Sequence, residues 1–250
     1  MTKIGSKYIQ ELIDATKKIE EAGWHKSTRS GNTGIGKTFE DLLEKEEDNK
    51  DLPDFYDIEV KTHEVASASL ITLFTKAPSY PRGVNTMLRE KYGVLDEYGN
   101  KILHMTIAGN RKTNTKKYPF NFQVNADFEE KLVRLMVFDR ETDMLVDNSV
   151  YWTFEDLEKS IQRKLPTLAV VSAESKIESG IKYYKYNEVN FLTNFSVINL
   201  ANAINDGVVL IDIRIGAYKT GKNAGRTHDH GTGFRINMKK LLQYGTTIEV

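Results

Sequence analysis

The segment PDFYDIEVKTHE, residues 53–64, constrains the fold more than any other part of the chain. Over residues 56–62 polar and apolar residues alternate with period two, which is typical of a strand with one buried face. We expect Ile58 and Val60 to point into a core. The opposite face then carries Asp57, Glu59 and Lys61. The sequence therefore predicts a sheet in which one strand presents carboxylates and a lysine away from that core.

These polar residues suggest a cation site. Asp54 stands at the strand entrance, close to Asp57, Glu59 and Lys61, and carboxylate oxygens are the ligands that hard cations prefer. A lysine beside them can orient a water or stabilise charge on a phosphate. Glu40, placed in the first turn of a preceding helix, would add a third acid. The pattern predicts a site for one or two Mg²⁺ ions, the alternative being a surface strand with alternating charges.

A second motif, GNTGIGKT at residues 31–38, matches the letters of a phosphate-binding P-loop. VVLID, residues 208–212, even offers the apolar run ending in Asp that such enzymes use. A working P-loop follows a buried strand, however, and residues 22–30 contain no apolar run. The motif instead lies between an amphipathic helix near residues 7–21 and a second helix capped by Thr38. We interpret it as a decoy, with a P-loop ATPase kept as the lower-ranked alternative.

Composition narrows the class of protein. The 250 residues are enough for one large domain or two small ones, and 40% hydrophobic with 28% charged residues is typical of globular proteins. There is no cysteine, which excludes disulfides and Cys-based zinc sites. No apolar run approaches the roughly 20 residues of a membrane span, and the N-terminus lacks a signal-peptide core. We expect a cytoplasmic protein with no membrane partner.

The formal net charge is zero, with 35 basic and 35 acidic residues, but the charges are segregated. Residues 39–59 hold ten carboxylates and two lysines. Residues 101–126 hold five basic residues and no acid, and residues 213–240 hold seven basic residues opposed only by Asp229. An acidic centre with basic flanks suits a metal-dependent enzyme acting on a polyanion, although such runs can also be solvated faces.

Nine segments together resemble one known family. They are GNTGIGKTFEDLLEKEED, PDFYDIEVKTHE, LFTKAP, GNRKTN, DNSVYW, SAESKIE, YYKYN, DIRIGAY and HDHGTGFRINM. The chain is similar over residues 23–250 to the MvaI/BcnI type II restriction endonucleases, and more to the MvaI side of that family. These belong to the MutH-like branch of the PD-(D/E)xK nuclease superfamily. The resemblance implies a mixed α/β (α+β) fold with two lobes and a DNA-binding cleft between them.

The resemblance also assigns roles to residues. It makes Glu40, Asp54, Glu59 and Lys61 the catalytic set, with Asp54 and Glu59 holding Mg²⁺. On spacing alone Asp57 competes with Asp54, and only the resemblance favours Asp54. The expected organisation is a catalytic lobe over residues 1–150 and a DNA-recognition lobe over residues 151–250, with a chain that can cross between them.

The C-terminal third contains residues suited to reading bases. DIRIGAY alternates like a strand, and Arg is the usual partner of guanine, whereas Asp accepts from cytosine N4. The resemblance gives Asp212, Arg214, His230 and Arg235 this role, with His228 and Asp229 beside them. The alternatives are a structural strand with an ion pair and, for HDH, a zinc site. DNA backbone contacts are predicted for Arg111, Lys112, Lys116 and Lys117, in a basic loop that could equally be ordinary surface.

The sequence thus predicts a Mg²⁺-dependent, sequence-specific DNA endonuclease. By resemblance it would recognise 5′-CC(A/T)GG, cut between the second C and the central base, and act as a monomer that nicks each strand in turn. A cognate DNA methyltransferase would be its genetic partner only. The alternatives are a related enzyme with a C/G central pair, a MutH-like repair nickase and a DNA-binding module without hydrolysis.

Overall fold

The computed structural model describes residues 8–43, 55–66 and 70–248, and these form two compact units. Unit 1 comprises residues 1–71, 161–195 and 237–250, and unit 2 comprises residues 72–160 and 196–236. The chain changes unit after residues 71, 160, 195 and 236, so the division differs from a single boundary near residue 150. The reason is that strands from the second half of the sequence complete the sheet that begins in the first half.

Unit 1 contains a mixed sheet in the order β1-β10-β9-β2, with β14 also paired to β10. Its two long strands, β9 and β10, form an antiparallel hairpin, and β2 lies parallel to β9 at the edge. The strands are β1 (Trp24–Lys26), β2 (Glu59–Glu64), β9 (Thr167–Glu178), β10 (Ile181–Thr193) and β14 (Thr246–Ile248). The predicted strand that carries Glu59 and Lys61 is therefore held by a partner more than one hundred residues later in the chain.

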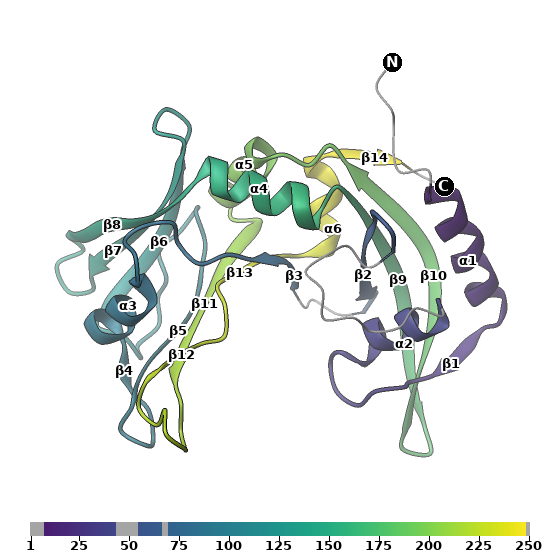
Figure 1. Cartoon of the computed structure of the whole chain (residues 1–250), viewed down its shortest axis with the longest axis horizontal. Coiled ribbons are helices and arrows are strands. Elements are labelled where there is room, and N and C mark those ends of the chain that lie inside the picture. The colour runs from purple at the N-terminus through teal and green to yellow at the C-terminus, as the bar shows by residue number, and fades with distance from the viewer. Residues whose placement is uncertain (1–7, 44–54, 67–69, 249–250) are drawn as a thin grey trace. The chain divides into compact units, whose positions relative to one another are not determined.

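Two helices, α1 (Ile9–Glu21) and α2 (Gly34–Leu42), cover one face of this sheet, and α1 runs beside β10 (Figure 1). Unit 1 also contains α6 (Met238–Leu241), with a 3₁₀ turn at Leu242–Tyr244. Leu12 and Phe39 are fully buried against the sheet, as are Ile58 and Tyr186. Full burial of such side chains contributes about 1.5–3 kcal/mol each. Ile58 and Val60 do face the core, as the alternation predicts.

The second helix differs from its prediction. It begins at Gly34 with Thr33 as N-cap, five residues before the predicted start at Phe39. Gly34 has no room for a side chain, since a Cβ there would lie 2.4 Å from the Arg29 carbonyl oxygen. Thr38 is consequently inside the helix rather than at its cap, and its hydroxyl oxygen accepts a hydrogen bond from the Thr28 N–H at 3.0 Å.

Unit 2 is built on a sheet in the order β3-β13-β11-β5-β4, with β12 also paired to β11. Its central strand β11 is antiparallel to β5, β12 and β13 (Figure 1). The strands are β3 (Ile71–Thr75), β4 (Val94–Leu95), β5 (Lys101–Ile107), β11 (Val209–Ala217), β12 (Thr227–Asp229) and β13 (Gly233–Ile236). Along β11 the residues Ile211, Ile213 and Ile215 are buried, which fixes the opposite face as the polar one.

A separate sheet, β6-β7-β8, and three helices complete unit 2. The elements are β6 (Phe120–Asp127), β7 (Leu132–Asp139), β8 (Leu145–Thr153), α3 (Val84–Tyr92), α4 (Phe154–Lys164) and α5 (Val197–Asn205). The chain passes from unit 2 to unit 1 within α4. The Asn205 side chain bonds both the N–H and the carbonyl of Ala126, which ties α5 to β6. Among the described residues, no helix is long and apolar enough to cross a membrane.

Local sequence periodicity accounts for the main elements in the second half of the chain. The runs VRLMVFD, PTLAVVSAES and VVLIDIRIG coincide with β7, β9 and β11. The two helical patterns, TFEDLEKSIQRKL and NFSVINLANAIND, coincide with α4 and α5. Ser196 forms a capping box with Asn199 at the start of α5, which accounts for the sharpness of that boundary. The strands of the described residues form three sheets.

Asp147 on β8 anchors helix α3 to unit 2. Its side chain is 8% exposed and accepts hydrogen bonds from the Tyr92 hydroxyl and, at 2.9 Å, from Lys91 Nζ. Burial opposes ionisation, but hydrogen bonds from Tyr92, Ser149 and Lys91 outweigh it and lower the pKa of Asp147. Because the folded pKa is lowered, the stabilisation is present above the ordinary pKa of about 3.8 and is lost as pH falls through the folded value.

We predict that Asp147→Asn lowers the free energy of unfolding by about 1.5–3 kcal/mol at pH 7, the range for hydrogen bonds to a charged group. The variant should also lose less stability than the wild type between pH 5 and pH 3. Urea denaturation at both pH values measures this. Asp143→Asn is the control, because Asp143 pairs with Lys112 at 2.6 Å with 66% of its side chain exposed. A loss of stability as small as the control's would contradict the anchoring role.

Candidate functional site

Glu59 and Lys61 form a close ion pair at the start of β2. Lys61 Nζ lies 2.5 Å from Glu59 Oε1, and the Glu59 side chain is 6% exposed whereas that of Lys61 is 26% exposed. The two residues are two positions apart on one strand, so they share a face of the sheet. Parallel pairing with β9 sets Glu59 opposite Leu168 and Lys61 opposite Val170. A buried carboxylate thus lies next to an ammonium group that still reaches solvent.

Asp57 does not lie on that face. Phe55 and Ile58 exchange two backbone hydrogen bonds of 2.8 Å, which makes Tyr56 and Asp57 the tip of a tight turn. Tyr56 has a φ of +54°, and Asp57 is exposed. The predicted alternation therefore starts at Ile58 rather than at Tyr56, because the turn breaks the pleat. Asp54, the other predicted acid at the strand entrance, lies outside the described residues.

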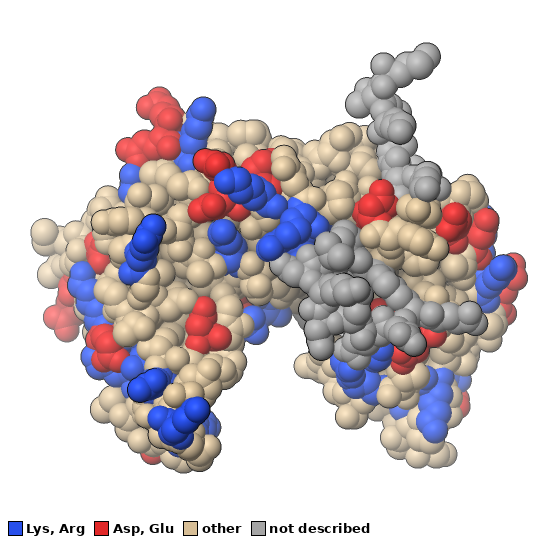
Figure 2. All heavy atoms as spheres, in the orientation of Figure 1, with Lys and Arg blue, Asp and Glu red and all other residues tan. Residues whose placement is uncertain are grey.

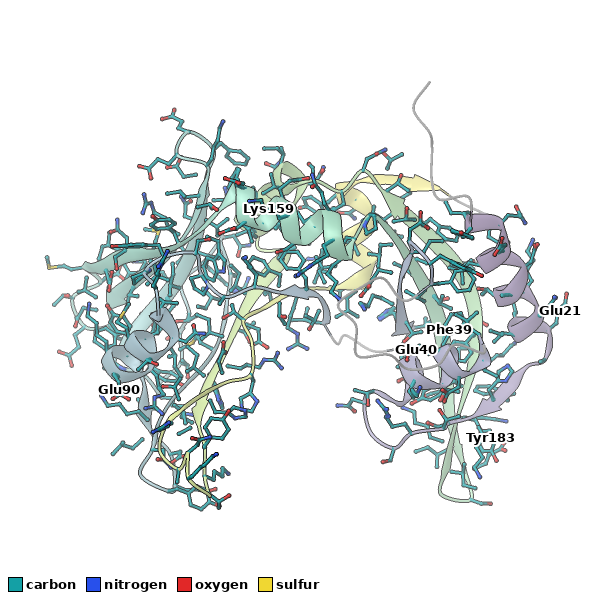
Figure 3. The ribbon with its side chains drawn as sticks, in the orientation of Figure 1. Glu21, Phe39, Glu40, Glu90, Lys159 and Tyr183 are labelled. Carbon is teal, nitrogen blue, oxygen red and sulfur yellow. The ribbon has the colours of Figure 1, made fainter. Side chains whose placement is uncertain are left out.

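Glu40 is brought toward the same strand by α2. A Cβ on Gly36 would lie 3.6 Å from the Thr62 hydroxyl oxygen, so α2 packs its Gly36 side closely against β2. Glu40 follows Gly36 by four residues and so lies on the same side of the helix, one turn further on. Figure 3 shows it on α2 beside the buried Phe39. Contrary to the prediction, Glu40 lies in the last turns of the helix, because α2 begins at Gly34.

The GNTGIGKT segment does not form a phosphate cradle. A strand does precede it, contrary to the prediction, but β1 has only three residues. Gly34, Gly36 and Lys37 already belong to α2, and backbone N–H groups there bond within the chain, Gly34 to Gly31 and Lys37 to Thr33. Lys37 Nζ lies 2.9 Å from Asp41 Oδ1. The groups that a P-loop would direct at a nucleotide are engaged in holding the helix.

The donor chemistry of the strand and helix fits a divalent cation. Glu59 supplies a buried carboxylate and Glu40 a half-buried one, and oxygen ligands are what Mg²⁺ and Ca²⁺ take in proteins. Within residues 8–43, 55–66 and 70–248, no group of three or more His, Asp or Glu side chains converges as a metal site.

In unit 2, Asp212 is the centre of a polar cluster on the sheet. The residue is 6% exposed and its carboxylate accepts from the Thr106 hydroxyl at 2.9 Å. Arg235 Nη1 lies 3.1 Å and Arg214 Nε 3.6 Å from Asp212 Oδ2. The alternating pattern of β11 therefore does place Asp212 and Arg214 on one face, and β13 adds Arg235 to them. A hydrogen bond to Asp212 orients the Arg235 guanidinium, whereas Arg214 Nη2 donates to the His230 carbonyl at 3.4 Å.

The HDH segment forms β12 and the turn after it. The His230 ring lies against that of His228, with centroids 4.2 Å apart, and His228 lies against Tyr218 at 4.3 Å. Asp229 caps the turn, since its carboxylate accepts from the Gly231 N–H at 2.8 Å and from Asn85 Nδ2 at 2.6 Å. His230 borders a pocket of about 480 Å³ that Asp212 and Arg214 also line. Asp229 thus has a structural role that the sequence did not indicate.

The predicted basic loop borders the same polar face. A second pocket of about 470 Å³ is lined by Thr106 and by loop residues that include Arg111, Lys112 and Lys117. Lys112 is engaged with Asp143 and lies 3.8 Å from the centre of the Phe138 ring. Lys116 is exposed. Lys and Arg side chains also gather where the loop between β11 and β12 lies (Figure 2), and Lys219, Lys222 and Arg226 are its exposed basic residues.

One residue of this face, His104, is absent from the sequence predictions. It lies on β5 directly across from Arg214, and Thr106 lies across from Asp212. A signal was available: in KILHMTI the residues Leu103, Met105 and Ile107 are buried, so His104 and Thr106 alternate onto the polar face. Local alternation does not identify His104 as the neighbour of Arg214, because the pairing of β5 with β11 joins segments about one hundred residues apart.

Fold and site together define a nuclease-like protein of the PD-(D/E)xK type, with a carboxylate–lysine pair on an edge strand of a helix-covered mixed sheet. The MvaI/BcnI restriction endonuclease family model matches residues 13–243. A solved complex of restriction endonuclease MvaI with its cognate DNA substrate is 57% identical, covering 98% of this chain and 99% of that one, with a TM-score of 0.88. MvaI without DNA is 56% identical over 99% of each chain, with a TM-score of 0.71. No curated protein matches the chain by sequence.

The chain belongs to the MvaI/BcnI restriction endonuclease family. It is a type II restriction endonuclease, an enzyme that hydrolyses DNA at specific sequences, and members of this group use divalent metal ions. This assignment bears out the predicted fold class and activity.

Proposed function

We propose that this enzyme recognises 5′-CC(A/T)GG in double-stranded DNA and cuts between the second C and the central base. The observation that carries this proposal is the polar face of β11, where Asp212 forms ion pairs with Arg214 and Arg235. Asp accepting from cytosine and Arg donating to guanine suit a site made mainly of G·C pairs. The 57% identity to MvaI supports the (A/T) central pair over the C/G pair of a related enzyme.

The catalytic set of this proposal is Glu40, Asp54, Glu59 and Lys61. Asp54 and Glu59 would hold Mg²⁺, with Glu40 completing the acidic shell directly or through water. When bound, the ion supplies Lewis-acid polarisation of the scissile phosphate and lowers the pKa of the attacking water. Lys61 positions that water or neutralises charge that develops on the phosphate, and its pairing with Glu59 fixes its Nζ for this role.

The reading set is Asp212, Arg214, His230 and Arg235, with His228 and Asp229 supporting the turn. The DNA backbone phosphates would be held by Arg111, Lys112, Lys116 and Lys117. We propose residues 1–71, 161–195 and 237–250 as the catalytic unit and the remainder as the recognition unit. This replaces the division at residue 150.

We further propose a monomer that nicks each strand in turn, in the cytoplasm, where incoming DNA is met. A cognate methyltransferase would protect the host site without binding the enzyme. A repair nickase of the MutH type shares the active site, and differs in leaving one strand intact.

The test is a digest of unmethylated DNA of known sequence with purified protein and Mg²⁺, followed by mapping of the ends. Discrete double-strand cuts at CC(A/T)GG, with 5′-phosphate and 3′-hydroxyl ends, are expected. Cuts at another motif would overturn the reading set and keep the catalytic set. Nicks in one strand alone would favour the repair-type enzyme.

Lys61→Ala is predicted to lower the cleavage rate at saturating DNA by at least about a hundredfold, because the group that positions water or offsets developing charge is lost. Binding to the cognate site should change little, since Lys61 reads no base. Single-turnover cleavage and a gel-shift titration separate the two. Asp54→Ala should behave alike. A comparable loss of binding in both variants would show that these roles are misassigned.

Arg235→Ala is predicted to cost about 1–3 kcal/mol of discrimination at one guanine of the site. The measurement compares kcat/KM on the cognate site and on sites with a single substituted base pair. Lys159→Ala is the control, since Lys159 is exposed and pairs with Glu155 one helical turn away, at 2.6 Å. An unchanged preference at every position in Arg235→Ala would contradict the reading role.

A further inference from the structure

His104 has the position of a residue that contacts DNA bases, although it lies far in sequence from the predicted reading set. It stands on β5 opposite Arg214, and its neighbour on the same face, Thr106, bonds Asp212. Its backbone is fixed on both sides, because the Tyr118 hydroxyl accepts from the His104 N–H at 2.9 Å and donates to its carbonyl at 3.2 Å. The side chain is exposed on a rigid strand.

The surroundings of His104 are open and concave. It lines three adjoining pockets of about 480, 370 and 470 Å³ on this face of the sheet. Gly216 lies close to both rings, since a Cβ there would lie 3.8 Å from the Nε2 atoms of His104 and His230. The two imidazoles therefore present a ring nitrogen toward the same stretch of β11.

The charged side chains around His104 determine which kind of ligand atom it can bind. Burial lowers the pKa of His104, Lys117, His230 and Arg214 lower it further, and only Asp212 acts the other way. The neutral imidazole keeps one N–H donor. Because its neighbours are mostly cationic, an electron-rich partner is favoured, and guanine presents two acceptors, N7 and O6, in the major groove.

We propose that His104 is a further specificity-determining residue, whose imidazole N–H donates to N7 of one guanine of the recognition site. The inference rests on the proposed reading of DNA by β11 and extends that surface to β5. Thr106 is distinct from His104, since it acts through Asp212 as a positioning residue.

The test couples a protein substitution to a base substitution. Each guanine of the mapped cleavage site is replaced in turn by 7-deazaguanine, which lacks the N7 acceptor, and kcat/KM is measured for wild type and for His104→Ala. We expect 7-deazaguanine at one position to lower the wild-type value roughly fivefold, the effect of one hydrogen bond, and to have no further effect on His104→Ala. His104→Gln, whose amide can donate to the same acceptor, should still show part of the reduction in kcat/KM caused by 7-deazaguanine.

Two controls make the outcome decisive. His104→Phe keeps a ring of similar size without a hydrogen-bond donor, and it should behave like His104→Ala. If the alanine variant does not fold, His104→Phe takes its place in the test. His25→Gln alters a histidine of unit 1 that bonds the Ile19 carbonyl at 2.8 Å, and it should keep the wild-type 7-deazaguanine profile. If 7-deazaguanine lowers kcat/KM equally in the wild type and in both His104 variants at every guanine, the inference is overturned. Failure of wild-type protein to cut any specific site would instead overturn the proposed function.

Discussion

A single buried carboxylate organises the polar face of unit 2. Asp212 lies on the central strand of its sheet and accepts from Thr106 on one neighbouring strand and from Arg235 on the other, with Arg214 two residues along its own strand. Removing one partner of such a buried pair commonly costs about 3–5 kcal/mol, because the remaining charge is left uncompensated. The bond to Asp212 restricts the rotamer of Arg235 before DNA binds, and the His230 carbonyl accepts a hydrogen bond from Arg214. The positions of His104 and Thr106 follow from the register of β5 on β11, and that of Arg235 follows from the register of β13 on β11.

Unit 1 holds a carboxylate and a lysine together at the edge of its sheet. Glu59 is nearly buried, and an unpaired charge there would be strongly unfavourable. Its contact with Lys61 offsets that cost, and parallel pairing of β2 with β9 holds the strand in register. Phe39 anchors α2 on the core side, so that Glu40 follows on a fixed helix. A hairpin from the second half of the chain thus supports the chemistry placed in the first.

The neutral overall charge is compatible with a DNA enzyme because opposite charges are kept on different elements. The carboxylates cluster before and within β2, whereas exposed lysines and arginines occupy the loops after β5 and β11. Several of these cations are already engaged, as Lys112 is with Asp143, so the number of basic residues overstates the charge available to phosphates.

The P-loop motif at residues 31–38 also depends on its structural context. Whether it can bind a phosphate depends on where the following helix begins. This helix begins at Gly34, which is too early in the motif to leave a phosphate-binding loop.

The sequence by itself determined the strand with Ile58 and Val60 inward, the carboxylate–lysine pair, the face of β11 with Asp212 and Arg214, and the elements of the second half. Each follows from local periodicity, which is short-ranged and visible in consecutive residues. Only the tertiary structure placed Asp57 in a turn, started α2 at Gly34, used Asp229 as a turn cap and brought His104 across from Arg214. These depend on a tight steric contact, a backbone turn and strand pairings between distant segments. No local pattern encodes which distant strand will be the neighbour.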